Sequence, residues 1–260
     1  MDALETIRNH RSIRRYKPDP VSDEVLDAVL AAGMRAPSYG NMNAYSIVVS
    51  RDRETREKLF EPLKHQQMVL DAPVQVTFCA DFRRMRKWLA ANDAPDNFND
   101  FFSFMIGAVD AALVAQNTAL AAEATGLGIC YIGATLGNAH LVGEVLELPE
   151  GVVPITGFAM GWPDGELPAL KDRLPMSGLV HYERYNDRDE AAIAEIHRTR
   201  NKVGWDRYMA VPRLREQITK SGVENLAQVY TTLKYTPALH KKHTASLLTY
   251  LRKQGFLPKD

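Results

Sequence analysis

One long segment, residues 101–126, constrains the fold more than any other part of the chain. Its apolar residues recur at helical spacing and cover nearly the whole circumference, so we expect a helix of about 35–40 Å. Asp110, Gln116 and Glu123 interrupt the segment too often for a membrane span. A helix of this kind is buried on most sides, either in a core or between subunits.

The remaining apolar patterns alternate irregularly between helix and strand. Ser22 is a good N-cap, because Asp23 and Glu24 follow it in the first turn of a helix. We expect helices at residues 2–9, 22–36, 53–63 and 138–146, and strands at residues 46–50, 74–80, 130–132 and 152–160. This order predicts an α+β fold with a mixed sheet rather than a doubly wound one.

The character of the chain changes near Tyr185. Two charged helices follow, which we expect at residues 187–205 and 239–255. We therefore predict a main domain at residues 1–187 and a helical C-terminal extension of the same domain at residues 188–260.

Composition excludes several classes of function. Lys plus Arg and Asp plus Glu both number 32, so the whole chain has no electrostatic bias toward nucleic acid or anionic membranes. The chain shows neither a signal pattern at its start nor an uncharged apolar run of about 18 residues. Cys79 and Cys130 stand in apolar runs, where buried reduced thiols are favoured over a disulfide. We expect a cytoplasmic protein that binds neither nucleic acid nor membrane.

Two polar segments near the N-terminus carry residues suited to binding an anion and a ring. The first is His10-Arg11-Ser12-Ile13-Arg14, whose guanidinium groups suit phosphate oxygens and whose serine adds a hydroxyl. The second is Pro37-Ser38-Tyr39-Gly40-Asn41, in which Gly40 allows positive φ and Asn41 can match the polar edge of a pyrimidine ring. Taken alone, a solvated basic turn and an ordinary loop remain open as alternatives.

Two further segments follow the long helix. At residues 126–134 Gly126 and Gly128 stop the helix, an apolar strand follows, and Gly133 and Ala134 leave room for a flat ring against the backbone. The order, helix and then strand, differs from the glycine-rich dinucleotide fingerprint. Farther along, Lys171 and Arg173 are two apart in extended chain, so both charges can converge on one anion, although a simple charged loop is the alternative.

In this order and spacing the four segments resemble the FMN-dependent nitroreductase family. Within that family the resemblance is to the branch of the major oxygen-insensitive NADPH nitroreductase and the NADPH:flavin reductases, and it runs from about residue 4 to about residue 185. It implies a mixed, mainly antiparallel sheet surrounded by helices, non-covalently bound FMN, NADPH or NADH as electron donor, and a homodimer with FMN at the interface.

The resemblance also implies roles for individual residues. His10, Arg11 and Ser12 would face the phosphate and ribityl chain, and Arg14 the N1/O2 edge of the flavin, whereas Arg15 has no counterpart and is expected to be a surface charge. Further flavin contacts are implied at Ser38, Gly40, Asn41, Gln66, Tyr131, Ile132, Gly133 and Ala134, with Gln67 as the competitor of Gln66. Lys171 and Arg173 would complete the phosphate site. Candidates for the 2′-phosphate of NADPH are Arg198, Arg200 and Lys202, for which a plain helix end is the alternative.

The function that this resemblance implies is two-electron transfer from NAD(P)H to nitroaromatics, quinones or flavins by a ping-pong scheme. No protein residue is expected to act as catalytic acid or base in the hydride step, and no metal is expected. The alternatives are a dedicated flavin reductase and a non-redox flavin-binding protein. Substrate choice is expected to reside in residues 83–103, a candidate lid, and in residues 195–208.

Overall fold

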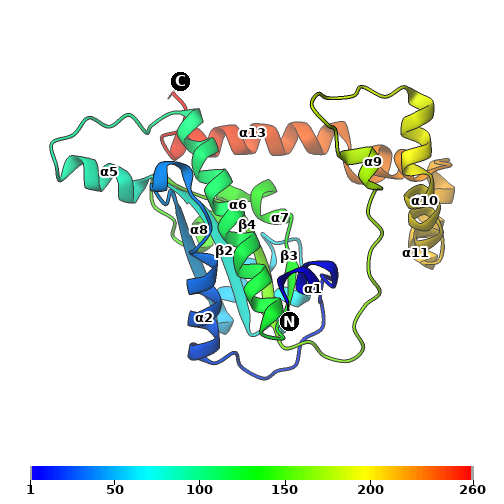
Figure 1. The fold of residues 1–260 in the computed structure, drawn as a ribbon, viewed down its shortest axis with the longest axis horizontal. Helices are drawn as coiled ribbons and strands as arrows, with labels where there is room; N and C mark the ends of the chain where they lie inside the picture. The colour runs from blue at the N-terminus through cyan, green and yellow to red at the C-terminus, as the bar shows by residue number, and fades with distance from the viewer. Residues whose placement is uncertain (1, 259–260) are drawn as a thin grey trace. The chain divides into compact units, whose positions relative to one another are not determined.

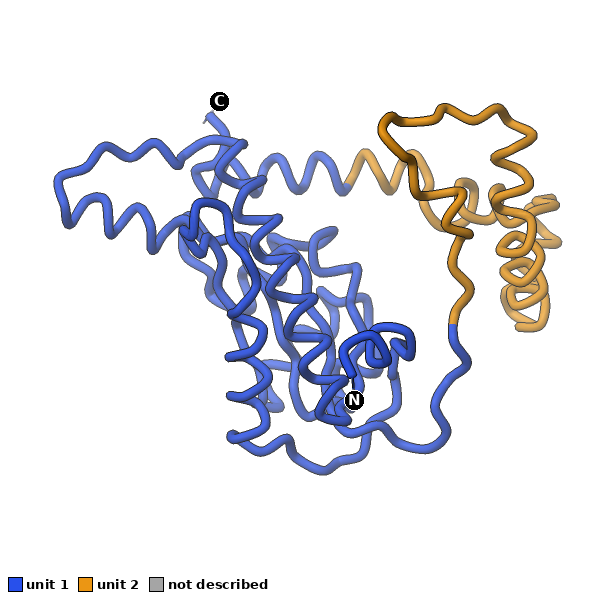
Figure 2. Tube along the Cα trace, in the orientation of Figure 1, with its two compact units in different colours: residues 1–170, 243–260 blue, residues 171–242 orange. Residues whose placement is uncertain are grey.

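The computed structural model describes residues 2–258, which fall into two compact units (Figure 2). Unit 1 comprises residues 1–170 and 243–260, and unit 2 comprises residues 171–242. This division differs from the domain boundary expected after residue 187, because the end of the chain returns to unit 1. The boundary itself stays a prediction.

A four-stranded sheet of order β1-β2-β4-β3 forms the centre of unit 1 (Figure 1). The strands are β1 (Tyr45–Ser50), β2 (Val74–Asp81), β3 (Gly128–Tyr131) and β4 (Val152–Gly161). The α+β class is confirmed. The sheet was expected to be mixed and mainly antiparallel, and within the described residues all three pairings are antiparallel.

Helices surround this sheet, and their starts follow local capping signals. The Ser22 side chain accepts a hydrogen bond from the Val25 amide at 3.3 Å, as its N-cap position predicts. The helices of unit 1 before residue 170 are α1 (Ala3–Arg8), α2 (Asp23–Gly33), α3 (Arg53–Phe60), α4 (Met68–Asp71), α5 (Arg83–Ala90), α6 (Phe101–Ala124), α7 (Ala134–Gly137) and α8 (Ala139–Val145).

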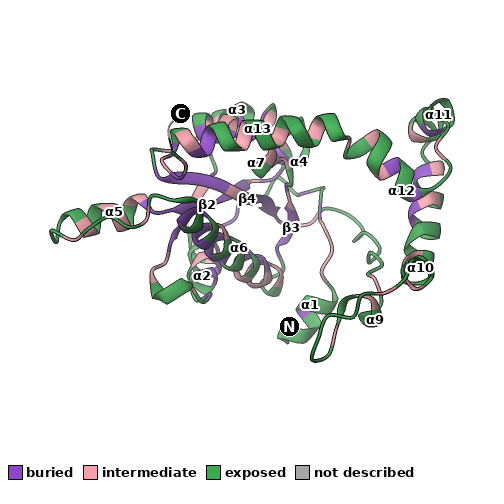
Figure 3. Cartoon of the chain, turned by 90° about the horizontal axis from the view of Figure 1, so that it is seen from above, coloured by how far each residue is buried: buried purple, intermediate pink, exposed green. Residues whose placement is uncertain are grey.

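The long helix predicted at residues 101–126 is α6, which packs against α2 and β2 (Figures 1 and 3). Asp100 caps it by accepting a hydrogen bond from the Ser103 amide at 2.8 Å. Most sides of this helix were expected to be buried, in a core or between subunits. Within one described chain α2 and β2 cover one side, while Phe102 is 63% and Val109 53% exposed, so the core of a single chain does not cover the whole helix. By length and hydropathy alone α6 could cross a membrane, but a core helix packed on one side passes the same test.

The turn after α6 differs in detail from the sequence prediction. Gly126 has a φ of +89°, as a glycine that ends a helix should, but β3 ends at Tyr131. Gly133 and Ala134 therefore lie at the start of the short helix α7 and not in the strand. The helix predicted at residues 138–146 is α8 (Ala139–Val145), and just before it the Asn138 side chain donates to the carbonyl oxygen of Pro62 at 2.6 Å.

Unit 2 is a small helical assembly. Tyr208, Ile218, Leu226 and Val229 form its buried apolar cluster. Its helices are α9 (Met176–Leu179), α10 (Glu190–Met209), α11 (Pro212–Ser221), α12 (Leu226–Gln228) and the π-helical η2 (Val229–Lys234), and α13 (Pro237–Lys253) begins in unit 2 and ends in unit 1. The two charged helices predicted in this part of the chain correspond to α10 and α13.

Candidate functional site

The first of the four segments, residues 10–14, lies beside the third, residues 126–134, in unit 1. The amide of Ile13 donates to the carbonyl oxygen of Ile129 in β3 at 2.9 Å. The Ile13 side chain occupies the space beside Gly128, where an added β-carbon would lie 2.5 Å from Ile13 Cγ1. Gly128, the first residue of β3, is therefore needed for this close approach, whereas Gly126 with its positive φ follows the end of the helix.

Ser12 and Arg14, on either side of Ile13, lie next to Cys130. Burial raises the pKa of the Cys130 thiol, while the Arg14 charge and a hydrogen bond from Ser12 act in the opposite direction. Tyr16 anchors the segment, because its hydroxyl donates to the carbonyl oxygens of Ile13 at 2.6 Å and Ala159 at 3.1 Å. Burial raises the pKa of Tyr16 well above its usual range, so this hydroxyl keeps its proton.

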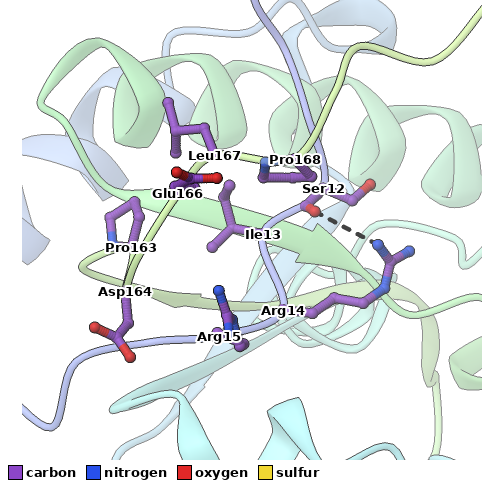
Figure 4. A pocket seen from close by; sticks show the side chains of 9 residues that line it. All are labelled: Ser12, Ile13, Arg14, Arg15, Pro163, Asp164, Glu166, Leu167 and Pro168. Carbon is purple, nitrogen blue, oxygen red and sulfur yellow. Dashed lines mark hydrogen bonds between the residues drawn. The ribbon is translucent and has the colours of Figure 1, made fainter.

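A hollow of about 390 Å³ opens beside this segment (Figure 4). Its lining consists of Ser12, Ile13, Arg14, Arg15, Pro163, Asp164, Glu166, Leu167 and Pro168. Figure 4 shows Arg14 on the side of Ser12 and Arg15 on the side of Asp164. Arg15, which the sequence suggested to be only a surface charge, is therefore a wall of the hollow, and no motif in the sequence pointed to it.

The N-terminal end of the same segment is tied to α6. His10 Nδ1 lies 2.7 Å from Glu123 Oε1, and Arg11 Nε donates to the carbonyl oxygen of Asn9 at 3.1 Å. Arg11 and Glu123 also face a second hollow, of about 320 Å³, whose other walls are mostly apolar. In the sequence Glu123 was only a polar interruption of an apolar helix, because its partner lies 113 positions away.

Gln66 is connected to the apolar cluster that contains Ile13 through its bond to Leu63. Its side-chain amide donates to the carbonyl oxygen of Leu63 at 2.9 Å, and Leu63 belongs to the buried cluster that includes Ile13, Cys130 and Ile132. Gln67 is exposed and bonds Asp71 Oδ1 at 2.7 Å. The role of Gln66 as a flavin contact, with Gln67 as its competitor, stays a prediction.

The strand end adds an open surface. An added β-carbon at Gly133 would meet no atom within 4 Å, so the backbone there is accessible to a flat ligand. Burial and, to a smaller extent, the Glu123 charge raise the pKa of Tyr131. Tyr131 thus contributes a neutral side chain next to Ile132, Gly133 and Ala134.

The second polar segment is held by a buried carboxylate that the sequence did not reveal as functional. Asp110 of α6 accepts hydrogen bonds from the amides of Tyr39 at 2.9 Å and Ala44 at 3.1 Å. Gly40 has the positive φ that was expected, +54°, and Asn41 follows at +56°. The Ser38 hydroxyl is engaged within the loop, where it accepts from the amide of Asn43 at 3.1 Å.

The structure does not bring this loop to residues 10–14 within one chain. Asp110, which binds the loop, and Glu123, which binds His10, are thirteen positions apart on α6. At the helical rise per residue this separation is about 20 Å. Ser38, Gly40 and Asn41 therefore form a second group of candidate residues, separate from the first.

The remaining predicted residues belong to unit 2. Arg173 Nη1 donates to the carbonyl oxygen of Lys171 at 3.2 Å in an extended stretch without helix or strand. On α10, Arg198 pairs with Glu195 at 2.9 Å and Lys202 with Asp206 at 2.6 Å. Arg200 lies over the Tyr230 ring, 6.0 Å from its centroid. The binding roles of these five residues stay predictions.

The residues of unit 1 fit the phosphate-bearing flavin that the sequence suggested. Within residues 2–258, Arg11 and Arg14 have no carboxylate at ion-pair distance, so their charges are available to an anion. The open backbone at Gly133 suits a flat ring. No group of three His, Cys, Asp or Glu side chains in this described part of the chain is arranged to hold a metal ion.

Comparison with known proteins identifies the family of this chain. The model of the family described as "Nitroreductase family" matches residues 7–162. An FMN reductase [NAD(P)H] of Bacillus subtilis is 33% identical over 98% of both chains. An oxygen-insensitive NADPH nitroreductase of Salmonella typhimurium is 37% identical over 74% of this chain and 78% of its own. The solved structure of the NADPH:FMN oxidoreductase from Vibrio harveyi, complexed with NAD+, superposes with a TM-score of 0.74 at 31% identity over the whole of both chains.

Proposed function

Since the chain belongs to the nitroreductase family, as the match over residues 7–162 and the 33% identity over 98% of its length establish, we propose that it is an NAD(P)H-dependent flavin oxidoreductase. It passes two electrons to a small acceptor, for which nitroaromatics, quinones and flavins are the candidates. The observation that carries this proposal is the alignment of Ser12 and Arg14 along β3, next to the open backbone at Gly133.

FMN, when bound, supplies the hydride-accepting and hydride-donating chemistry, so the protein provides position and charge. Arg11 and Arg14 provide donors for the phosphate and for the anionic edge of the ring. Gln66 offers both an acceptor and a donor to a ring edge. Gly133 leaves the backbone open to the ring, and no protein acid or base is needed in the hydride step.

Lys171 and Arg173 complete the phosphate site in this proposal. Their double substitution by alanine should weaken FMN strongly, since a hydrogen bond to a charged group is worth about 1.5–3 kcal/mol. The FMN dissociation constant measured by fluorescence tests this, and an unchanged value would remove the two residues from the phosphate site.

We infer a homodimer from the distance along α6 between the attachment points of two candidate segments. Residues 10–14 and the loop at residues 37–41 are held about 20 Å apart in one chain, so a second copy is needed for both to contact one flavin. The exposed apolar face of α6, with Phe102, Met105 and Val109, supports such an interface. Mixing a chain altered at Arg14 with one altered at Asn41 should restore one intact site per dimer, and light scattering gives the mass.

A second candidate function is a dedicated flavin reductase that supplies reduced FMN to another enzyme. The similarity to the Bacillus subtilis FMN reductase favours it. Free FMN as the best acceptor would support this function, and a nitroaromatic or quinone as the best acceptor would support the first. For either, we propose a cytoplasmic location, because both cysteines are buried and unpaired, which suits a reducing compartment.

The deciding experiment is purification followed by a visible spectrum and steady-state rates. We expect a yellow protein with about one FMN per subunit, bleached by NADPH or NADH in stopped flow. A flavin that stays oxidised with both nucleotides would indicate a non-redox flavin-binding protein. A colourless protein that does not take up FMN would overturn the proposal.

A further inference from the structure

Glu123 occupies a costly position for a carboxylate. It lies in the last turn of α6, and its side chain is only 12% exposed. Oε1 is 2.7 Å from His10 Nδ1, and Oε2 is buried without a hydrogen-bond partner. The chain therefore keeps a half-satisfied, nearly buried carboxylate at this point.

Two physical effects oppose that arrangement. The free carbonyl groups at the C-terminal end of a helix carry partial negative charge, which repels a carboxylate in the last turn. Removing a carboxylate from water is also unfavourable unless hydrogen bonds replace the water. Among residues 2–258 only His10 forms an ion pair with Glu123. An apolar pair of similar volume would serve stability as well or better, so the pair points to another role.

The chemistry of imidazole defines that role. An ionised carboxylate only accepts hydrogen bonds, so the bond from His10 to Glu123 requires the proton on Nδ1. Since Nδ1 is engaged, Nε2 is the one ring nitrogen left for another partner. Glu123 thus selects both the orientation of the ring and the nitrogen that remains available.

The same contact fixes the segment that follows. His10 is held by Glu123, and three positions later Ile13 is held by Ile129 in β3. Arg11 and Ser12 lie between these two attachment points. The backbone of these two residues is thereby fixed at both ends, although neither forms a hydrogen bond or an ion pair with Glu123.

We propose that Glu123 is a positioning residue of the flavin site, which orients His10 so that Nε2 faces the ribityl-phosphate part of FMN. This inference rests on the proposed function. It adds that a carboxylate from α6 belongs to the site although it never contacts the cofactor.

The test uses the full-length, FMN-loaded protein and the variants Glu123→Ala, Glu123→Gln, His10→Ala and the double alanine variant. Glu5→Gln, an exposed carboxylate on α1, is the matched control. The FMN dissociation constant is measured from flavin fluorescence on dilution of the loaded protein. Long-range ¹H–¹⁵N spectra of ¹⁵N-histidine-labelled protein report which ring nitrogen of His10 carries the proton. The signals of His10 are assigned as those that are missing from the spectrum of His10→Ala.

We expect Nδ1 of His10 to be protonated in the natural protein and Glu123→Ala to lose this preference. FMN should bind about 5- to 30-fold more weakly in that variant, the effect of one lost hydrogen bond. In the His10→Ala background the same substitution should change FMN affinity by less than about twofold. Glu123→Gln should retain both the tautomer and most of the affinity, because an amide oxygen can accept the same bond, and Glu5→Gln should change neither.

Equal losses of affinity from Glu123→Ala with and without His10 would show that Glu123 acts through general stability, and the proposal would be overturned. It would also be overturned by a His10 ring protonated only at Nε2, or by a glutamine variant as damaged as the alanine one. If the alanine variant does not fold, the natural tautomer and the glutamine variant decide. A protein that binds no FMN at all contradicts the proposed function instead, and the tautomer measurement remains interpretable.

Discussion

Ile13 is packed so closely against Gly128 that position 128 has no room for a side chain. A β-carbon at Gly128 would lie 2.5, 2.7 and 2.9 Å from three side-chain atoms of Ile13. This contact joins the segment that carries Ser12 and Arg14 to the strand that precedes the open surface at Gly133. The geometry of the candidate site therefore depends on one pair of residues that meet no ligand.

Gly128→Ala should destabilise the protein by about 1–3 kcal/mol, the usual effect of overpacking a core. It should also weaken FMN, because Ile13 must move and Ser12 and Arg14 move with it. Urea unfolding and FMN content measure the two effects. Adding Ile13→Ala, which removes the clashing atoms Cγ1 and Cγ2, should make the loss of unfolding free energy smaller than the sum of the two single losses, and additive losses would show that the strain lies elsewhere.

Gly133→Ala is the matched substitution at a position with open space. No atom lies within 4 Å of the added β-carbon, and the backbone φ of −65° suits alanine. The free energy of unfolding should stay within about 0.5 kcal/mol of the natural protein. FMN affinity should fall if the ring lies against this backbone, and an unchanged dissociation constant would place the ring elsewhere.

The elements of the fold that could be predicted from sequence are those with local signals. Ser22 could be recognised as a cap because its partner, the Val25 amide, is three residues away. The start of α8 could be predicted to within one residue, since the helix expected at residues 138–146 is found at Ala139–Val145. The bond from the Asn138 side chain to the carbonyl oxygen of Pro62 could not be predicted, because the partner lies 76 positions away.

The site shows the same limit. Arg11, Ser12 and Arg14 stand in a recognisable segment, so their chemistry could be read from the sequence. Asp110 and Glu123 stand in an apolar helix whose periodicity reveals only burial. Their partners are 71 and 113 positions away, and no local pattern contains that information.

Asp110→Asn should disorder the loop at residues 37–44. The buried carboxylate accepts two backbone amides, whereas an asparagine side chain presents one acceptor and one donor, leaving one amide unsatisfied. An unsatisfied buried donor costs about 1–3 kcal/mol, so the free energy of unfolding should fall by that amount. Hydrogen exchange at Tyr39 and Ala44 measures the local effect, and unchanged protection of both amides would contradict it.

Stability should decrease at alkaline pH through Tyr250. Burial, the largest cause, raises the pKa of Tyr250 from 10.0 to about 12. Because the folded pKa exceeds the unfolded one, the folded state favours the protonated phenol. This stability is fully present below pH 10 and is lost as the pH rises toward about 12. Urea unfolding at pH 9, 10, 11 and 12 should show the loss, and Tyr250→Phe should show a smaller one.

Nucleotide preference should depend on Arg200 more than on its two neighbours. Arg198 and Lys202 already pair with carboxylates on their own helix, whereas Arg200 has no ion pair in the described chain and only lies over the Tyr230 ring. Its charge is therefore the most available of the three to the extra phosphate of NADPH.

Arg200→Ala should raise KM for NADPH by about tenfold, as the loss of one charged hydrogen bond predicts, and leave KM for NADH nearly unchanged. Lys202→Ala should have a smaller effect, because the Asp206 carboxylate beside it already offsets part of its charge. Lys220→Ala is the control, because Lys220 pairs with Glu216 on α11 in the same way. Equal changes in KM for both nucleotides would show that Arg200 only supports the helices of unit 2.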